Sequence, residues 1–540
     1  MKNENASRPN ILWISFEDTN PFYGCYGDDM ARTPNVDNLA SEGCVWPNCF
    51  STAGVCAPAR SAVITGMYPT SIGTHHMRTS WHIPYSIDPP TPYSAVIPHY
   101  AKCFSEYFRA AGYYCTNNKK TDYQFDAPFT AWDECSNTAH WRNRPDPDQP
   151  FFAVFNHDST HESCMWPEKG PEPNFDPDKI ELPPYFPDTP KVRESMAKMY
   201  TNIEIADGVL GRILNELEED GLADNTIVVH WSDHGPMPRG KRWPYDSGIH
   251  VPMIVRWPGE IEPGTRSDRL VSTVDLAPTM LSCAGLDIPW HMQGQAFLGE
   301  EEAEPRDYIF ATRDRYDIDY DMIRAARDKR FKYIRNYRPD LPYMLWVPYR
   351  NQHPIVEEMY RLHLNDELNE EQSLMFRDSR PVEELYDTEA DPWEVNNLAE
   401  DPDYATHLNR LSNALDDWID EVGDLGEIPE TEMVRAWYPD GERPQTAPAV
   451  PVPICESSPG IEEHNNFEGG TYQGPFMVQL YCSTQGASIG YRLEGQAEDA
   501  PWQLYTGPIT LPPGTHVLHT RAVRIGYLES EEKTITLTVE

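Results

Sequence analysis

Short apolar runs alternate with longer amphipathic segments through about the first 300 residues of the chain. Four runs are expected to be strands: NILWISF at 10–16, GYYCT at 112–116, FFAVF at 151–155 and TIVVHW at 226–231. Between the last two runs, apolar residues from Met196 to Leu217 recur at helical spacing, and Gly221 follows where a C-cap is expected. This alternation predicts an α/β fold, with a mainly parallel sheet and helices on both faces.

Polar side chains follow each predicted strand. In open α/β sheets, ligands bind beyond the carboxyl ends of the strands. We therefore expect one crevice to collect the polar residues that follow the four strands, namely Glu17, Asp18, Lys119, Lys120, His161, Asp233 and His234.

The later part of the chain predicts two further units. We assign residues 1–325 to the large α/β domain, and the charged, aromatic-rich segments over 326–440 to a smaller α+β subdomain with a helix near 401–422. Prolines with polar spacers over 441–470 indicate a stiff linker. Over 471–540, alternating strands separated by turn residues predict a small β-sandwich.

Composition indicates which partners and which cellular location to expect. The chain has 86 acidic and 44 basic residues, a net charge of −42, which disfavours binding to nucleic acid or anionic membranes. No apolar run reaches about 18 residues, and MKNENASRPN lacks the pattern of a signal peptide. The sequence as given therefore predicts a cytoplasmic protein, or a periplasmic or secreted one if a signal peptide has been trimmed. The eleven cysteines show neither a disulfide framework nor zinc-like spacing, and the oligomeric state is left open.

One cysteine stands at a predicted helix start. In GVCAPARS, Cys56 comes just before Pro58, which suits the first turn of a helix. The free N–H groups there would lower the pKa of the thiol and attract an anion, with Arg60 adding charge. Taken alone, this pattern is more typical of a buried structural cysteine than of a reactive one.

The segment CAPAR resembles the Cys-x-Pro-x-Arg signature of the type I sulfatases of the alkaline-phosphatase superfamily. RPNILWISFED, CYGDDMARTPNVDNLASEG, WSDHG, RGKRWPYDSGIHVPMIVRWPG and ELYDTEADPWEVNNLA are similar to the same family in the same order, so the resemblance covers roughly residues 8–425. It implies an alkaline-phosphatase-like fold. The C-terminal segment is similar to chitobiase C-terminal, Ig-like modules.

The resemblance implies that a formylglycine-generating enzyme oxidises Cys56 to Cα-formylglycine, whose hydrated aldehyde supplies the nucleophile. It also implies a divalent cation, usually Ca²⁺, at the residues Glu17, Asp18, Asp233, His234 and Cys56. Glu17 stands where an aspartate is commonest and His234 where an asparagine is commonest, which leaves the metal preference open.

Further site residues are carried over from the resemblance. Lys119 or Lys120, of which spacing favours Lys120, and Lys241 match the two lysines that bind the sulfate, and Arg60 is the arginine of the signature. His161 matches the general acid for the leaving oxygen, a role that suits a pKa near neutrality. The family usually continues with Lys-x-His, whereas this chain has Asp122 in place of the histidine. The residues expected to contact a sugar are His75, His76, Arg78, Trp81 and His157; packing under a loop is an equal alternative for the first four.

These observations predict a formylglycine-dependent, metal-requiring sulfatase that acts on a sulfated carbohydrate. Two alternatives share the scaffold: a phosphonate monoester or phosphodiester hydrolase, and an N-sulfoglucosamine sulfohydrolase. A non-catalytic sugar-binding protein is the alternative outside enzymes.

Overall fold

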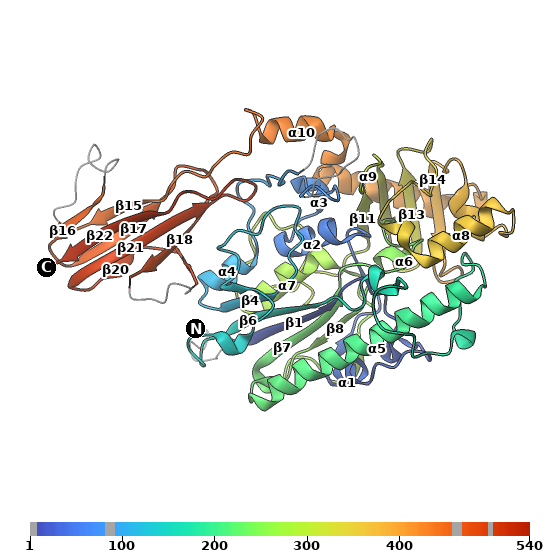
Figure 1. Cartoon of the computed structure of the whole chain (residues 1–540), viewed down its shortest axis with the longest axis horizontal. Helices are drawn as coiled ribbons and strands as arrows, with labels where there is room; N and C mark the ends of the chain where they lie inside the picture. The colour runs from blue at the N-terminus through green and yellow to red at the C-terminus, as the bar shows by residue number, and fades with distance from the viewer. Residues whose placement is uncertain (1–7, 81–91, 456–466, 495–500) are drawn as a thin grey trace.

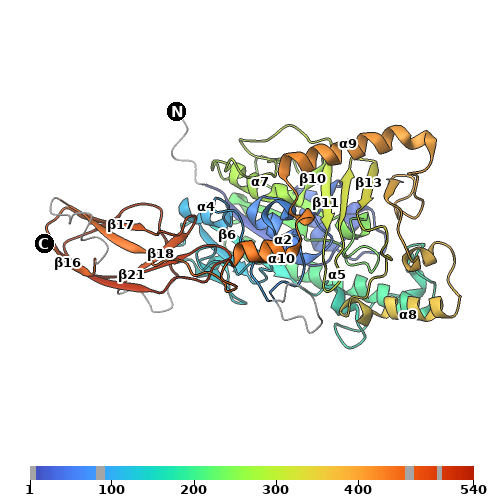
Figure 2. The same cartoon turned by 90° about the horizontal axis from the view of Figure 1, so that it is seen from above.

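The computed structural model describes residues 8–80, 92–455, 467–494 and 501–540. These residues form a large α/β domain, a smaller antiparallel sheet beside it and a C-terminal β-module (Figure 1). Figure 2 shows the β-module at one end of the molecule and the smaller sheet at the other. Within the described residues, no helix has the length and apolar content needed to span a membrane.

The large domain is built on an eight-stranded sheet within the described residues. In spatial order its strands are β5 (Glu134–Cys135), β4 (Tyr114–Asn118), β6 (Phe151–His157), β1 (Asn10–Phe16), β7 (Thr226–Ser232), β8 (Met253–Arg256), β2 (Cys44–Val45) and β9 (Thr265–Arg266). The four strands predicted from the apolar runs are β4, β6, β1 and β7, and they are parallel neighbours. The predicted α/β class is confirmed.

The central strand β1 is buried on both faces. Leu12, Ile14 and Phe16 belong to one apolar cluster, whereas Ile11 and Trp13 belong to another on the opposite face. A strand covered on both sides has no solvent face to keep polar, which explains its continuous apolar run.

Helices cover both faces of this sheet (Figure 1). On one face lie α1 (Pro34–Glu42) and α5 (Pro190–Glu219), and on the other lie α2 (Cys56–Thr65), α4 (Ser105–Ala110) and α7 (Leu276–Cys283). The predicted apolar stripe of α5 is buried against the sheet. This helix ends at Glu219, and Gly221 follows in the left-handed conformation, with φ of +68°. The short elements are β3 (Cys49–Phe50), β10 (Val271–Ser272), α3 (Pro69–Ile72) and α6 (Asp246–Ile249).

The smaller sheet begins earlier than predicted. Its antiparallel strands are β11 (Ile309–Arg313), β12 (Ile323–Arg327), β13 (Phe331–Asn336) and β14 (Glu383–Asp387), with the helices α8 (Pro354–Leu364), α9 (Ala405–Val422) and α10 (Glu430–Trp437) in the same part of the chain. The predicted boundary between residues 325 and 326 therefore falls inside β12. The strands are hard to recognise in the sequence because they bury charged side chains: Arg324 lies 2.9 Å from Asp314 and 2.6 Å from Asp424.

The predicted linker over 441–470 also contains structure. β15 (Val450–Ile454) pairs with β17 (Phe476–Tyr481), which pairs with β20 (Ile509–Leu511). The second sheet of the module has the order β16 (Gly469–Tyr472), β22 (Lys533–Val539), β21 (Gly514–Val523), β18 (Ser488–Leu493) and β19 (Gln503–Leu504). Pro451 and Pro453 are buried in β15, an edge strand, where a missing N–H costs no ladder hydrogen bond. The module thus begins within the predicted linker.

The β-module packs directly on the large domain. Lys102 donates to the carbonyl of Gly486 at 2.7 Å, and Arg524 donates to the carbonyl of Ile97 at 2.7 Å. Ile525 is buried in the apolar cluster of the large domain rather than in that of the module. The two units therefore share part of one core.

Ile525→Ala tests this shared core. Removing its buried methylenes should cost about 2–5 kcal/mol and lower the melting temperature in a thermal unfolding experiment. Leu528→Ala is the control, because Leu528 follows Ile525 closely in the chain but is 47% exposed. Equal melting temperatures for the two variants would show that Ile525 contributes nothing to docking.

Candidate active site

The polar residues after the four parallel strands converge, as predicted. Their side chains surround a cavity of about 920 Å³. Among the residues predicted for the site, its lining includes Glu17, Cys56, Arg78, Lys119, Lys120, His157, His161 and Lys241. Asp18, Asp233 and His234 lie beneath them and are almost fully buried.

Cys56 is the first residue of α2 and is preceded by Val55 as N-cap. Its Sγ lies 3.1 Å from Nε2 of His234 and 3.7 Å from Oε1 of Glu17. We expected the helix terminus to lower the pKa of this thiol. In the structure, burial raises that pKa well above its ordinary value, and the carboxylates of Asp18 and Asp233 oppose the lowering effect of Lys241. Burial is therefore the largest influence on the pKa of this thiol.

Acidic side chains surround the thiol. Ligand atoms of Glu17, Asp18, Cys56 and His161 lie within 4.8 Å of one another, as do those of a second group in which Asp233 and His234 join Asp18 and Cys56. Burial alone would raise the pKa of Asp233, yet Arg60 and His234 hold it well below its ordinary value. Several buried carboxylate oxygens in one place are the donor set that a hard divalent cation requires. The residues present therefore fit a divalent metal.

Two lysines and one arginine balance these carboxylates. Lys241 lies 2.5 Å from Asp18 and 3.1 Å from Glu162. Lys120 forms an ion pair with Glu17 and lies 3.7 Å from Asp122. Although burial opposes its charge, the pKa of Lys241 is raised because Asp18 and Glu162 favour the ammonium form.

Arg60 joins α2 to the ends of two strands. Its Nε donates to Asp233 at 2.9 Å, and its Nη1 donates to the Oδ1 of Asn156 at 2.9 Å. Because Arg60 lies one helical turn after Cys56, the helix brings this guanidinium close to the same carboxylates as the thiol.

His161 stands at the cavity wall. Its Nε2 lies 3.9 Å from Asp18 and 4.0 Å from Glu17, and its Nδ1 lies 2.9 Å from the hydroxyl of Ser163. We expected a pKa near neutrality, but burial lowers the pKa of His161 to about 4. His157 also lines the cavity, and burial lowers the pKa of its imidazole as well.

The predicted sugar-contacting residues divide into two sets. His75 and His76 do not line the cavity: they are buried, and His76 accepts from the backbone N–H of Arg315 at 3.3 Å. Their position beneath a loop matches the alternative interpretation. Arg78 does line the cavity, where it pairs with Asp317 at 2.5 Å. Trp81 lies outside the described residues.

The sequence analysis did not identify Glu162, Asp317 or Tyr349 as part of the site. Glu162 accepts from Arg242 at 2.8 Å and donates its backbone N–H to Asp18 at 2.8 Å. It therefore connects the segment that carries Lys241 and Arg242 to the acidic side chains around Cys56. Glu162 directly follows His161 in the sequence, and this position was the one signal that could have placed it in the site. Tyr349 lies under the guanidinium of Arg78, 4.9 Å from it, and no local pattern marks this tyrosine.

Backbone strain is concentrated at this site. Of eight non-glycine residues with positive φ in the described chain, six line the cavity or the acidic cluster: Asp18, Arg78, Asp122, Gln124, Arg242 and Asp317. Such conformations cost energy and persist where the surrounding structure enforces them, which is typical of functional sites.

Comparison with known families gives three matches. The sulfatase family matches residues 9–147 and 137–286, the C-terminal region of N-sulphoglucosamine sulphohydrolase matches 234–361, and the chitobiase/beta-hexosaminidase C-terminal domain matches 467–536. The last match confirms the resemblance stated for the β-module.

Individual proteins agree with these matches. An ulvan-active sulfatase from Formosa agariphila is 43% identical over 564 aligned positions, which cover 97% of this chain and 90% of the relative. Two solved structures share the fold at 19% identity. BT4656, in complex with its substrate D-glucosamine-2-N,6-O-disulfate, has a TM-score of 0.55 and covers 78% of this chain and 100% of its own. The phosphonate monoester hydrolase of Agrobacterium radiobacter has a TM-score of 0.58, with coverages of 78% and 97%.

A basic and acidic cluster around Cys56 occurs on the expected fold, the family model spans more than half of the chain, and a named sulfatase aligns along nearly all of it. The chain therefore belongs to the sulfatase family and is a sulfuric ester hydrolase.

Proposed function

We propose that this sulfatase removes sulfate esters from saccharides derived from ulvan, using a formylglycine made from Cys56 and a bound divalent cation, Ca²⁺ being the expected ion. The observation that carries the proposal is the placement of the Cys56 Sγ among the side chains of Glu17, Asp18 and His234 at the floor of a cavity large enough for a sugar. The choice of ulvan is supported by the 43% identity to the ulvan-active sulfatase.

Two groups would be supplied after translation. Formylglycine would provide an oxygen nucleophile at position 56 in place of a thiol. A divalent cation held by Glu17, Asp18 and Asp233 would act as a Lewis acid toward the sulfate oxygens. His234 is the fourth residue of this set, and its imidazole in place of a carbonyl oxygen leaves room for a softer metal than Ca²⁺.

Two lysines of the cavity would bind the sulfate group. Lys120 and Lys241 can donate to sulfate oxygens, which stabilises the charge that develops on them as the S–O bond breaks. Both ammonium groups are held beside the carboxylates of the floor, and a cation bound by those carboxylates would free them to contact the sulfate.

His161 is the residue proposed to protonate the leaving oxygen. With a pKa of about 4 it is mostly neutral at neutral pH in the free enzyme. A bound sulfate ester brings a negative charge near the ring, and a nearby negative charge favours the protonated imidazole. The acid form is therefore expected in the substrate complex.

The direct test is sulfate release from ulvan oligosaccharides by protein produced together with a formylglycine-generating enzyme. N-Sulfoglucosamine and an aryl phosphonate monoester serve as parallel substrates, because a family match and a structural likeness respectively connect them to this scaffold. Release of sulfate from ulvan oligosaccharides above the other two rates supports the proposal. A dominant rate on either parallel substrate would reassign the enzyme.

His161→Ala tests the general acid. The variant should be slowed by about 10²–10⁴-fold on an alkyl sugar sulfate, whose alkoxide needs a proton to leave. On an aryl sulfate with a good leaving group, the loss should be much smaller.

His157→Ala is the matched variant, because His157 lines the same cavity but is the last residue of β6, before the loop that carries His161. We expect similar changes on both substrates for this variant. Equal losses on both substrates for His161→Ala would assign His161 to sulfate or metal binding and would redirect the search for the acid to His157 or His234.

A further inference from the structure

Residues of the basic segment RGKRW, 239–243, line two different cavities. Lys241 and Arg242 line the catalytic cavity, where both are paired with Glu162. Arg239, Trp243 and other residues of the same loop line a second cavity of about 270 Å³. The loop therefore forms a wall between the two spaces, and the catalytic site accounts for only part of its positive charge.

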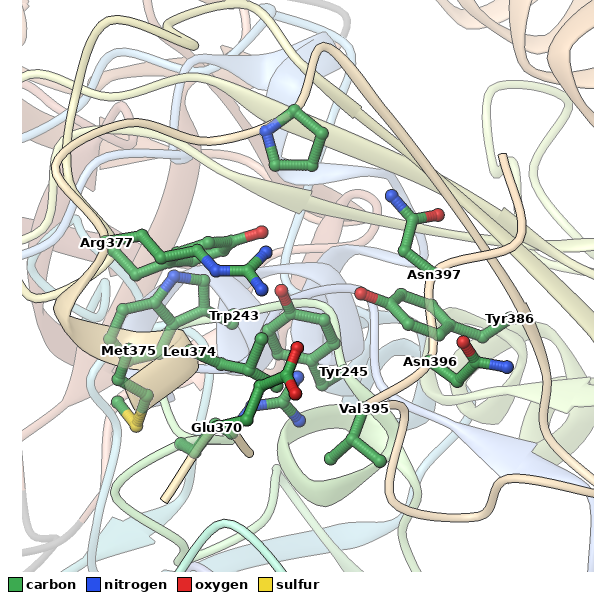
Figure 3. A pocket seen from close by; sticks show the side chains of 13 residues that line it. Trp243, Tyr245, Glu370, Leu374, Met375, Arg377, Tyr386, Val395, Asn396 and Asn397 are labelled. Carbon is green, nitrogen blue, oxygen red and sulfur yellow. The ribbon is translucent and has the colours of Figure 1, made fainter. Parts of the chain in front are cut away.

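The second cavity has an aromatic and polar lining (Figure 3). Trp243 and Arg377 lie on one side of it, Asn396 and Asn397 lie on the other, and Tyr245 lies between them. The remaining lining residues are Arg239, Tyr343, Glu370, Leu374, Met375, Pro381, Tyr386 and Val395. These residues come from the loop before α6, from β14 and from the segments on either side of it.

Arg239 is a buried cation without an ion pair in the described part of the chain. Only 4% of the residue is exposed. Its guanidinium donates to the carbonyls of Trp393 and Glu394 at 2.9 and 2.6 Å, and it lies 4.1 Å from the ring centroid of Tyr245. These neutral partners orient the group but do not neutralise it.

The carboxylates nearest to this region have other partners. Glu394 lies 2.7 Å from the ammonium of Lys332 and accepts from the backbone N–H of Asp246. Glu384 accepts from the hydroxyls of Tyr245, Tyr343 and Tyr386 at 2.9, 2.9 and 2.6 Å. No carboxylate of the described residues forms an ion pair with Arg239, so a bound anion would add the direct charge partner that its carbonyl and ring contacts do not supply.

A second guanidinium stands at the rim of the same cavity. Arg377 is exposed and makes no ion pair with a described residue, while Glu370 is the acidic side chain of the rim. Trp243 adds an indole whose Nε1 has no hydrogen-bond partner among the described residues. Arginine at both the floor and the rim favours an anion, and the aromatic rings favour the face of a sugar.

We propose that this second cavity binds an anionic pyranoside, with its carboxylate or sulfate group on Arg239 and Arg377 and its ring against the aromatic wall. The choice of a sugar rests on the proposed function, whereas the expectation of an anionic group rests on Arg239 and Arg377. The cavity would hold a charged sugar unit outside the catalytic cavity, on the far side of the loop that carries Lys241.

Calorimetric titration of the full-length Cys56→Ala variant tests the site without turnover. The probes are D-glucuronate, D-glucose 6-sulfate, inorganic sulfate and the neutral sugar D-glucose. We expect at least one charged sugar to bind, with inorganic sulfate and glucose much weaker. The first two probes distinguish a carboxylate from a sulfate as the anionic group.

Added to this background, Arg377→Ala should weaken binding of the charged sugar by roughly tenfold or more, as expected for a hydrogen bond to a charged group. Arg239→Gln should abolish it. Arg435→Ala is the control, since Arg435 is an exposed arginine of α10 that lines neither cavity. Arg239 also donates to two backbone carbonyls, so Arg239→Gln could fold poorly. Arg377 is exposed, so Arg377→Ala tests the site even in that case.

Charged-sugar affinity that is unchanged by Arg377→Ala would overturn the proposal, as would Arg377→Ala weakening inorganic sulfate binding as much as binding of the sugar sulfate. Failure of the proposed function has a different signature, namely no sulfate release by the matured wild-type enzyme from any sulfated saccharide. The binding result does not depend on that outcome.

Discussion

Cys56→Ala is expected to lower the rate of sulfate release by more than about 10³-fold, because the variant cannot carry the nucleophile at position 56. The change removes one sulfur atom from the first turn of α2, whose buried contacts continue through Val63 and Ile64. Folding should therefore be retained. Sulfate release and the thermal unfolding curve, measured on the same preparation, check both parts of this prediction.

Cys482→Ala is the matched control. Cys482 is a free cysteine of the β-module and does not line the catalytic cavity. Its replacement should leave sulfate release unchanged. Mass spectrometry of the peptide that contains position 56 adds an independent measurement: the wild-type residue should have lost the thiol mass and gained that of the aldehyde. Normal activity in Cys56→Ala would rule out the proposed chemistry.

Removal of divalent metal is expected to reduce sulfate release by more than about 100-fold, and Ca²⁺ should restore it. The reason lies in the buried cluster of Glu17, Asp18 and Asp233, whose oxygens lie together at the floor of the cavity. Without a cation, these carboxylates depend on Lys120, Lys241 and Arg60 for compensation, and those side chains would then be less available to the substrate.

The same metal should stabilise the fold. At a concentration 100 times its dissociation constant, a ligand that binds only the native state contributes about 2.7 kcal/mol. The melting temperature should therefore rise with Ca²⁺. In Asp18→Asn this rise should be lost, whereas Asp417→Asn, which changes an exposed carboxylate of α9, should retain it. Full activity in metal-free protein, with no thermal shift on adding Ca²⁺, would contradict a metal site.

The four strands around the site could be predicted because each depends on a local pattern. NILWISF is a continuous apolar run, and in the structure β1 is buried on both faces. The stripe of α5 and the short runs of β4, β6 and β7 are equally local. Since neighbouring parallel strands end at one edge of the sheet, the residues that follow them could be expected to meet.

Where the prediction failed, the relevant information was not local. β15 contains two prolines, and only its pairing with β17 makes it a strand. The strands β11 and β12 carry charged residues whose ion pairs, such as Arg324 with Asp424, join positions 100 residues apart. A composition change near residue 326 therefore marked no real boundary.

By itself, the sequence determined the α/β class and the order of the motifs, because apolar period and residue spacing are properties of short segments. The residues expected around Cys56 came from the strand ends and from the resemblance to the sulfatases. The tertiary structure decided what those residues experience. Burial raises the pKa of Cys56 despite its place at a helix start, and it lowers that of His161. Lys241 pairs with Asp18 across 223 positions, while Arg239, two residues earlier, lines another cavity. Burial and charge partners arise from segments brought together only by folding, so no local pattern could assign them.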